Sequence, residues 1–221
     1  MSDDRQVLWQ QQTAQEIASR LPTDASLKIV GSVGSPSLVD GWSDLDLHLR
    51  LPYAVRLVDL LGRARLWAAE VNDAPGGQVV RAVLTDGRRL DVLVETGQVL
   101  LPDLVRDNDL RFLAALAVTK LGRGDRLIGT HLVLEILQAC LVQAMLLRDR
   151  DEGTTVHRVG GARDSLAMAV GRILQLPLSV TPRPNIVERA VEMYGQWRGE
   201  LEAGYQADWQ GVNALLVRGL S

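Results

Sequence analysis

The sequence predicts an α+β fold, with a small mixed β-sheet domain over residues 1–100 followed by an α-helical bundle domain over residues 101–221. Two patterns of apolar residues support this prediction. Apolar and polar residues alternate over residues 44–51, which is the period of a β-strand with one buried face. After Leu101-Pro102 the apolar residues recur about every 3.6 positions, which is typical of amphipathic helices. The boundary between the two domains is therefore placed at Leu101-Pro102.

The elements of each domain follow from the same two periods and from turn residues. In the first domain we expect a helix over 4–20, strands over 27–32 and 44–51, a helix from Pro52, a helix or strand over 63–70, and strands over 78–84 and 89–95. Asp86-Gly87, between the last two strands, is typical of a hairpin turn. In the second domain we expect helices over 107–121, 126–148, 162–174, 184–196 and 198–219. The helix over 126–148 is apolar on nearly all sides, which predicts a central position in the bundle.

The composition argues against several classes of protein. The chain of 221 residues carries a net charge of −3 and only 4% of its residues are aromatic, so neither a basic surface nor a base-stacking platform for nucleic acid is expected. The single cysteine, Cys140, cannot form an intramolecular disulfide, and its apolar helical surroundings predict a core residue. The N-terminus does not resemble a signal peptide, and no uninterrupted apolar run is long enough to cross a membrane. We therefore expect a cytoplasmic protein without membrane contact, and its oligomeric state is left open.

Two aspartates, Asp44 and Asp46, stand at the start of the second predicted strand. Residues two apart in a strand project to the same face, with their Cα atoms about 7 Å apart. Two ionised carboxylates this close repel each other, and a bound divalent cation would remove that repulsion. Mg²⁺ prefers oxygen ligands and usually takes one or two carboxylates, completing its shell with phosphate oxygens and water. The pair therefore predicts a Mg²⁺ site that also binds phosphate groups.

Asp91, Gly31 and Ser32 complete the predicted site. Asp91 begins a later strand, and a third carboxylate would allow two metal ions about 3.5–4 Å apart, as in two-metal phosphoryl transfer. Gly31 ends the first apolar strand and would let the backbone approach a ligand closely. Ser32 follows it and offers a hydroxyl donor to a terminal phosphate. Ser35-Pro36 then predicts the start of a short helical turn whose free N–H groups would face an anion.

Three residues near this site are interpreted as structural or secondary. Trp42, just before the aspartates, is expected to be a packing anchor rather than a base-stacking residue. His48 continues the face of Asp44 and Asp46 but lies deeper along the strand, which favours a structural role. Glu95 shares the face of Asp91 but should lie at the far end of its strand, so it ranks behind Asp91 as a ligand.

Taken together, these motifs resemble those of a known superfamily. Gly31-Ser32, then Trp42-Ser43-Asp44-Leu45-Asp46-Leu47, then Asp86-Gly87-x-x-Leu90-Asp91-Val92 resemble the nucleotidyltransferase superfamily with the polymerase-beta-type fold. Within that superfamily the chain is most similar to small bacterial aminoglycoside and lincosamide antibiotic nucleotidyltransferases. The strong part of the resemblance covers residues 28–95.

The resemblance also implies a division of labour between the two domains. It implies a nucleotidyltransferase domain over residues 1–100, which binds metal and NTP, and a helical acceptor-binding domain over residues 101–221. One departure from the pattern concerns the phosphate loop. Many relatives carry an Arg-Gly shortly after the Gly-Ser, whereas this chain has Val33-Gly34-Ser35-Pro36 in that place, so the resemblance does not extend to a phosphate contact from that arginine.

Further candidate residues lie in the second domain. In similar proteins a lysine placed like Lys120 contacts the triphosphate, although the helix macrodipole would equally favour a lysine at a helix C-terminus. Arg123 follows closely and is a second candidate for nucleotide binding. His131, Glu135 and Gln138 form a polar stripe on the helix over 126–148. The stripe either faces solvent, or finds partners in the bundle, or faces the carboxylates, where Glu135 would act as general base or as anchor for the acceptor.

The resemblance thus implies an enzyme that transfers a nucleoside monophosphate from an NTP, expected to be ATP, to a hydroxyl of a small molecule such as an aminoglycoside-type antibiotic. Asp44 and Asp46 would hold Mg²⁺, Asp91 would complete a second metal site or accept the hydroxyl proton, and Gly31 and Ser32 would bind the phosphates. Two alternatives stay open. One is an enzyme that modifies a macromolecule, such as a protein-adenylylating antitoxin of a toxin–antitoxin pair or an RNA nucleotidyltransferase. The other is a catalytically silent nucleotide-binding scaffold.

Overall fold

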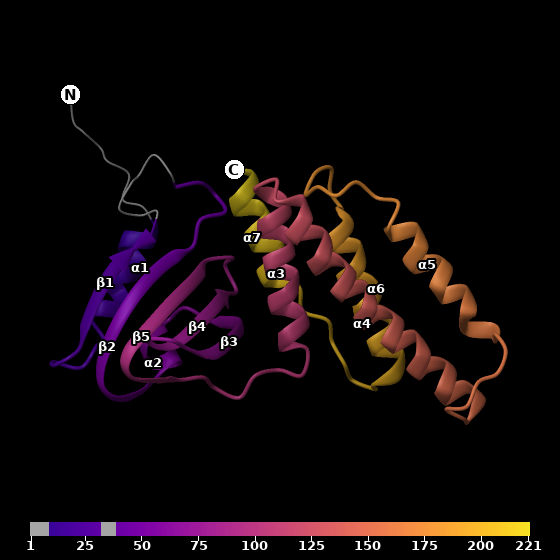
Figure 1. Ribbon diagram of the computed structural model, residues 1–221, viewed down its shortest axis with the longest axis horizontal. Coiled ribbons are helices and arrows are strands. Elements are labelled where there is room, and N and C mark those ends of the chain that lie inside the picture. The colour runs from indigo at the N-terminus through magenta and orange to yellow at the C-terminus, as the bar shows by residue number, and fades with distance from the viewer. Residues whose placement is uncertain (1–8, 32–38) are drawn as a thin grey trace. The chain divides into compact units, whose positions relative to one another are not determined.

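The computed structural model describes residues 9–31 and 39–221, and these residues form a mixed α and β structure (Figure 1). The chain divides into two compact units. The first unit comprises Met1–Phe112 together with Val217–Ser221, and the second comprises Leu113–Leu216. The α+β class predicted from the sequence is therefore confirmed.

The first unit is built on a five-stranded mixed sheet with the strand order β1-β2-β5-β4-β3 (Figure 1). The strands are β1 (Ser26–Val30), β2 (Leu45–Arg56), β3 (Leu66–Ala74), β4 (Gly77–Leu84) and β5 (Arg89–Leu100). Strands β2 and β5 pair in parallel, and the other neighbouring strands pair antiparallel. The expected hairpin is formed by β4 and β5, with Asp86-Gly87 in its turn.

One face of the sheet is buried against two helices, α1 (Trp9–Ala18) and α2 (Leu57–Leu61). Leu45, Leu47 and Leu49 of β2 are almost completely buried in this core, and the residues between them are not. Alternate residues of a strand point to opposite faces, so the burial of these leucines turns the intervening polar side chains to the other face. The alternation seen in the sequence therefore has the structural consequence that was expected of it.

Two predictions for the first unit are wrong. The helix expected from Pro52 is absent, because β2 continues to Arg56 opposite β5 and α2 spans only five residues. The pairing of β2 with β5 is irregular between Arg50 and Ala54, and this irregularity accommodates Pro52, which cannot donate a ladder hydrogen bond. The run Asp73-Ala74-Pro75-Gly76-Gly77 predicts a loop, but the structure reduces it to Pro75 and Gly76, because β3 runs to Ala74 and β4 begins at Gly77. In each case pairing with a distant strand outweighs local helix or turn propensity.

The division between the units falls within helix α3 (Asn108–Gly122), later in the chain than Leu101-Pro102. The start of α3 is bonded to the sheet. The side-chain amide of Asn108 donates to the carbonyl oxygen of Ala69 at 2.8 Å and accepts from its N–H at 3.0 Å. The Arg111 guanidinium lies 5.5 Å from the centre of the Trp67 ring. These contacts account for the assignment of the first turn of α3 to the sheet unit.

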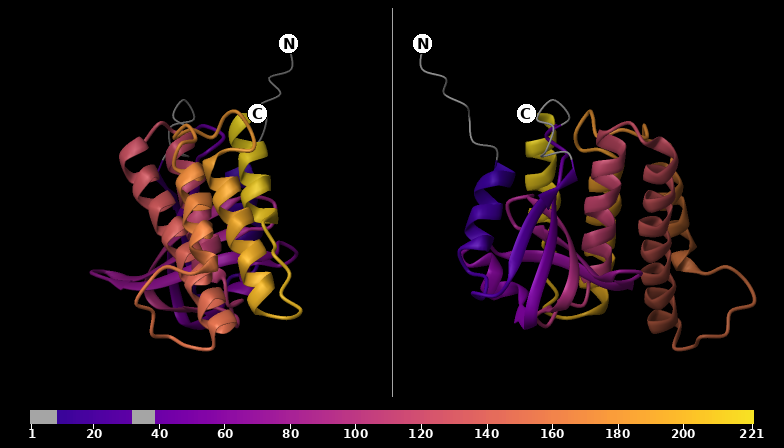
Figure 2. Two further views of the ribbon diagram at one scale, coloured as in Figure 1. Left: turned by 90° about the vertical axis from the view of Figure 1, so that its right-hand side faces the viewer. Right: turned by 60° about the vertical axis from the view of Figure 1, so that its left-hand side comes forward.

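The second unit is helical. Its further elements are α4 (Arg126–Glu152), the short 3₁₀ helix η3 (Ala162–Asp164), α5 (Ser165–Ile173), α6 (Ile186–Leu201) and α7 (Gln210–Leu220), whose end belongs to the first unit. Helix α4 packs against α6 and α5 (Figure 2). The single helix expected over 198–219 is wrong, because α6 ends at Leu201 and α7 begins at Gln210. Gly204 stands between them with φ +84°, a conformation that helical residues do not adopt.

One side of the centre of α4 lies in the core of this bundle, whereas Leu134, Leu141 and Val142 are exposed, so the helix is less central than its apolar sequence predicts. The Cys140 thiol is buried and donates to the carbonyl oxygen of Ala190 in α6 at 3.3 Å. Burial raises the pKa of this thiol to about 12, because the charged thiolate is disfavoured away from water. Cys140 is therefore the core residue that the sequence predicted. Among the described residues, α4 is also the one helix long and apolar enough to cross a membrane by length and composition, a test that core helices of soluble bundles also meet.

Candidate active site on the sheet

A row of charged, partly exposed side chains crosses the face of the sheet opposite α1 and α2. The strand registers pair Asp46 with Asp91 between β2 and β5, Asp91 with Arg81 between β5 and β4, and Arg81 with Glu70 between β4 and β3. Neighbouring strands lie about 4.8 Å apart and directly paired residues point to the same face. On the other side of β2, Asp46 pairs with the uncharged Val30 of β1. The two predicted metal ligands Asp46 and Asp91 are thus direct neighbours.

Asp44 and Arg89 form a second charged pair beside this row. Asp44 precedes β2 and Arg89 opens β5, each two residues before one of the paired aspartates. The Arg89 Nη2 and Asp44 Oδ2 atoms are 3.2 Å apart, and only 12% of the arginine side chain and 21% of the aspartate side chain are exposed. The structure therefore brings Asp44, Asp46 and Asp91 together where two parallel strands begin.

Arg81 links Asp91 to Glu70 by hydrogen bonds. Its Nε donates to Asp91 Oδ2 at 3.0 Å and its Nη1 donates to Glu70 Oε1 at 2.8 Å. The hydrogen bond to Glu70, and then the one to Asp91, raise the pKa of the Arg81 guanidinium. The sequence patterns did not single out Arg81 or Arg89. A two-residue turn at Asp86-Gly87 would pair residue 82 with residue 91. In the structure the Leu84 N–H donates to the Arg88 carbonyl oxygen, so three residues form the turn and Arg81 pairs with Asp91.

Gly31 packs directly against the Asp46 carboxylate. Its φ is +71°, a backbone conformation that favours glycine, and a Cβ built on it would lie 2.8 Å from Asp46 Cγ and 3.1 Å from Asp46 Cβ. The backbone conformation therefore disfavours a side chain at this position, and an added side chain would displace the Asp46 carboxylate. Gly31 allows a close approach, as expected, and the group it approaches is Asp46. Ser32, and the predicted turn at Ser35-Pro36, lie outside the described residues.

The turn before Asp44 is held by local hydrogen bonds and by the C-terminus of the chain. The Ser43 hydroxyl donates to Asp40 Oδ1 at 2.8 Å, and the Asp40 N–H donates to the Ser43 oxygen at 3.0 Å. Trp42 is buried, and its ring occupies the space that a Cβ on Gly219 would need. The interpretation of Trp42 as a packing anchor is therefore supported, and its packing positions the backbone that carries Asp44.

His48 and Glu95 form a separate cluster further along the same strands. The His48 Nδ1 and Glu95 Oε1 atoms are 3.1 Å apart, and the Arg50 Nε donates to Glu95 Oε2 at 2.6 Å. The hydrogen bond from Arg50, and secondarily the contact with His48, lower the pKa of the Glu95 carboxyl. This pairing supports the structural interpretation of His48 and the lower rank given to Glu95.

Lys120, Arg123 and Glu135 belong to the second unit, whereas the three aspartates belong to the first. The Lys120 Nζ lies 3.5 Å from Asp125 Oδ2 at the end of α3, which is the setting of a lysine at a helix C-terminus. Arg123 is exposed in the turn between α3 and α4. Their contact with nucleotide stays a prediction.

The polar stripe on α4 is exposed rather than buried in the bundle. The His131 Nε2 and Glu135 Oε1 atoms are 3.4 Å apart, with 68% and 44% of their side chains exposed, and Gln138 is exposed beside them. His131 and Glu135 pair with each other along α4, and other residues of the helix, among them Leu132, Ile136 and Leu137, take its buried positions. A role for Glu135 toward the acceptor stays a prediction.

The chemistry of the aspartate group fits a Mg²⁺ site. Three carboxylates on one face supply the oxygen donors that this cation prefers, and the close approach of Gly31 limits the positions open to the Asp46 carboxylate. Across residues 9–31 and 39–221, no three His, Cys, Asp or Glu side chains already converge as metal ligands do. Arg89 and Arg81 instead bond Asp44 and Asp91, so metal binding would require these arginines to release the carboxylates.

Comparison of the chain with protein-family models gave no match, and comparison with curated proteins gave none either. The geometry of the aspartates and arginines is therefore the basis of the functional argument.

Proposed function

We propose that this protein is a Mg²⁺-dependent nucleotidyltransferase that transfers a nucleoside monophosphate, with ATP the expected donor, to a hydroxyl of a small molecule. The observation that carries the proposal is the register of β2 and β5. It makes Asp46 and Asp91 neighbours where these two parallel strands begin, with Asp44 immediately before them. Three half-buried carboxylates on one face suit the binding of Mg²⁺ and a triphosphate.

The reaction assigns one task to each aspartate. Asp44 and Asp46 would hold Mg²⁺, which when bound offsets the negative charge of the triphosphate and of the leaving pyrophosphate. Asp91 would complete the metal site or accept the proton of the acceptor hydroxyl. The hydroxyl oxygen forms a bond to the α-phosphorus while the bond from that phosphorus to the bridging oxygen breaks. The electron pair of the broken bond leaves with pyrophosphate.

The two arginines balance the carboxylates when no substrate is bound. Arg89 bonds Asp44 and Arg81 bonds Asp91, which relieves the repulsion between the aspartates. Guanidinium groups bind phosphate as well as carboxylate, through the same fork of N–H donors. On substrate binding the arginines would exchange their carboxylate partners for phosphate oxygens. This exchange would make nucleotide and Mg²⁺ bind together rather than separately.

Other residues are proposed to contact the terminal phosphates of the nucleotide and the acceptor molecule. Gly31 and Ser32 would contact the β- and γ-phosphates, with Lys120 and Arg123 as further candidates. Glu135 would act on the acceptor side, as a base or as an anchor for a cationic group. An antibiotic of the aminoglycoside type as acceptor follows from the resemblance, and a cytoplasmic location follows from the composition of the sequence; both belong to the same proposal.

The proposal is tested by incubating the protein with each NTP, Mg²⁺ and a panel of hydroxyl-bearing antibiotics, followed by mass spectrometry of the products. A product heavier by one nucleoside monophosphate is expected, together with pyrophosphate. Asp46→Asn should abolish product formation and weaken the binding of Mg²⁺ and NTP measured by calorimetry. Asp59→Asn is the matched control, because Asp59 is an exposed carboxylate of α2 that pairs with Arg56, away from the aspartate group. Equal nucleotide binding by wild type and Asp46→Asn would refute the proposal.

A catalytically silent nucleotide-binding scaffold is the second candidate. The bonds of Arg89 and Arg81 to two of the three carboxylates favour it, because they keep the aspartates neutralised by the protein itself. The same calorimetry separates the candidates. A scaffold binds nucleotide and loses this binding in Arg89→Gln, but forms no product and no pyrophosphate with any NTP.

A further inference from the structure

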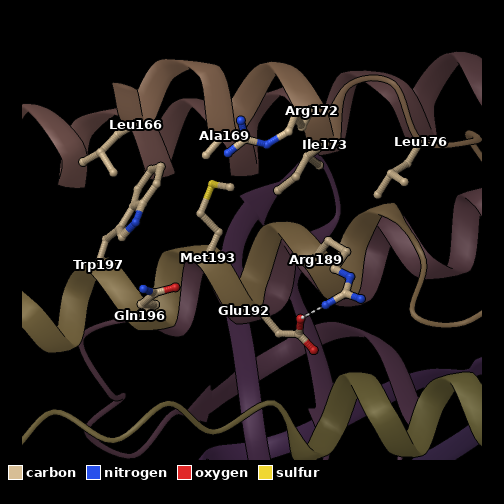
Figure 3. A pocket seen from close by; sticks show the side chains of 10 residues that line it. All are labelled: Leu166, Ala169, Arg172, Ile173, Leu176, Arg189, Glu192, Met193, Gln196 and Trp197. Carbon is tan, nitrogen blue, oxygen red and sulfur yellow. Dashed lines mark hydrogen bonds and ion pairs between the residues drawn. The ribbon is translucent and has the colours of Figure 1, made fainter. Parts of the chain in front are cut away.

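The second unit contains a pocket of about 520 Å³ between α5 and α6 (Figure 3). This volume lies within the usual range of small-molecule sites, about 300–1,000 Å³. Leu166 and Ile173 of α5 point toward α6, and Met193 and Trp197 of α6 point back toward α5. Leu176, just after α5, completes the apolar wall. The pocket is formed entirely within the second unit and is separate from the aspartate group.

The apolar wall of the pocket is only partly covered by the protein. Ile173 and Trp197 are buried, whereas Leu166, Leu176 and Met193 are only half-buried. Helix α5 is the weakly held side, because only Val170 and Ile173 among its residues are buried. An apolar molecule in the pocket would remove more of this surface from water and would hold α5 against α6.

The polar side chains of the pocket carry an excess of positive charge. Arg172 extends from α5, and Arg189 and Glu192 extend from α6 (Figure 3). The Arg189 Nη1 and Glu192 Oε2 atoms form an exposed pair 3.2 Å apart, so these two charges offset each other. The Arg172 side chain makes no hydrogen bond or ion pair with any residue that the structure describes. The charge that a ligand meets in this pocket is therefore positive.

We propose that this pocket binds a small apolar anion, with its hydrocarbon part between α5 and α6 and its carboxylate on Arg172. A guanidinium offers paired N–H donors that match a carboxylate, and the apolar wall supplies most of the buried surface. A polycationic molecule is excluded by charge, so this site is not the one for an aminoglycoside-type acceptor. The proposal does not depend on the function proposed for the aspartate group.

The test uses three probes of equal chain length, namely octanoate, octanol and octylammonium, with binding measured by calorimetry. Octanoate is expected to bind most tightly, octanol more weakly, and octylammonium least. Arg172→Gln should weaken octanoate binding about tenfold, the effect of losing one charge-assisted contact, and should leave octanol binding unchanged. Arg126→Gln is the matched control, because Arg126 is an exposed arginine at the start of α4 that does not line the pocket.

Filling the pocket provides the second arm of the test. Ala169 lines the pocket from α5, so Ala169→Trp should abolish the binding of both octanoate and octanol. Hydrogen exchange should also show slower exchange in α5 when octanoate is bound to the wild type. The proposal is overturned if octylammonium binds as tightly as octanoate or if Arg172→Gln leaves octanoate binding unchanged. It is also overturned if the wild type forms a dimer that Ala169→Trp dissociates, because a second copy would then be the occupant. The arginine variant keeps the test decisive even if the tryptophan variant does not fold.

Discussion

Replacing Gly31 with alanine is expected to separate the function of the aspartate group from the stability of the fold. Gly31 has φ +71°, and its added Cβ would lie 2.8 Å from Asp46 Cγ. The backbone conformation alone costs an alanine about 1–2 kcal/mol. The contact with Asp46 costs less, because the carboxylate ends a side chain that can rotate away. That rotation moves the Asp46 carboxylate away from its neighbour Asp91. The affinity for Mg²⁺ and ATP should therefore fall more than the free energy of unfolding does.

Gly153→Ala is the matched control for this substitution. Gly153 has φ +66°, almost the value at Gly31, and a Cβ there would meet no atom within 4 Å. Both variants should therefore lose about 1–2 kcal/mol of unfolding free energy in urea denaturation. Only Gly31→Ala should also lose affinity for Mg²⁺ and ATP added together, by about tenfold or more, which corresponds to about 1.4 kcal/mol.

Calorimetry of the two variants and the wild type, at one concentration of salt and Mg²⁺, supplies the comparison. Wild-type affinity in Gly31→Ala would show that the position of the Asp46 carboxylate does not matter for nucleotide binding. An equal loss of affinity in Gly153→Ala would show that the effect comes from general destabilisation. Either result would refute the reasoning.

Three further predictions concern single residues. Asp44→Asn should abolish transfer. It should also lower the unfolding free energy by about 1–2 kcal/mol, because the largely buried Arg89 loses its carboxylate partner. Unchanged stability in urea denaturation would contradict the importance of that pair. Glu135→Gln should change the free energy of unfolding by less than about 0.5 kcal/mol, because the pair of Glu135 with His131 is exposed. A lower turnover at unchanged nucleotide affinity would identify Glu135 as an acceptor-side group, and unchanged kinetics would remove it from the site. Cys140 should resist alkylation by iodoacetamide at pH 8 and react only after unfolding, because its pKa of about 12 keeps the buried thiol protonated. Labelling is measured by mass spectrometry, and rapid labelling of the native protein would argue against the packing of α4 on α6.

The sequence by itself determined the local part of the site. A strand has a period of two, so the buried leucines of β2 dictate that Asp46 faces away from the core, whatever the rest of the fold does. The Asp86-Gly87 turn likewise indicated the β4–β5 hairpin, whereas the register that pairs Arg81 with Asp91 was decided by the structure. The α+β class followed from the same periods, because the change from two to about 3.6 is a property of neighbouring residues.

Only the tertiary structure decided which distant residues meet. The parallel register of β2 and β5 makes Asp46 and Asp91 neighbours across 45 positions of the chain, and it also extends β2 through Pro52, where local propensity favours a helix. The partner of Asp44 was likewise undetermined until β2 and β5 were paired, because no sequence motif singles out Arg89, the first residue of β5. Helix α4 is apolar on nearly all sides, so its sequence alone did not indicate which side is buried, and packing against α6 placed Cys140 inside and Glu135 outside. Strand register and helix orientation depend on contacts between segments far apart in the chain, and the period of a single segment does not contain that information.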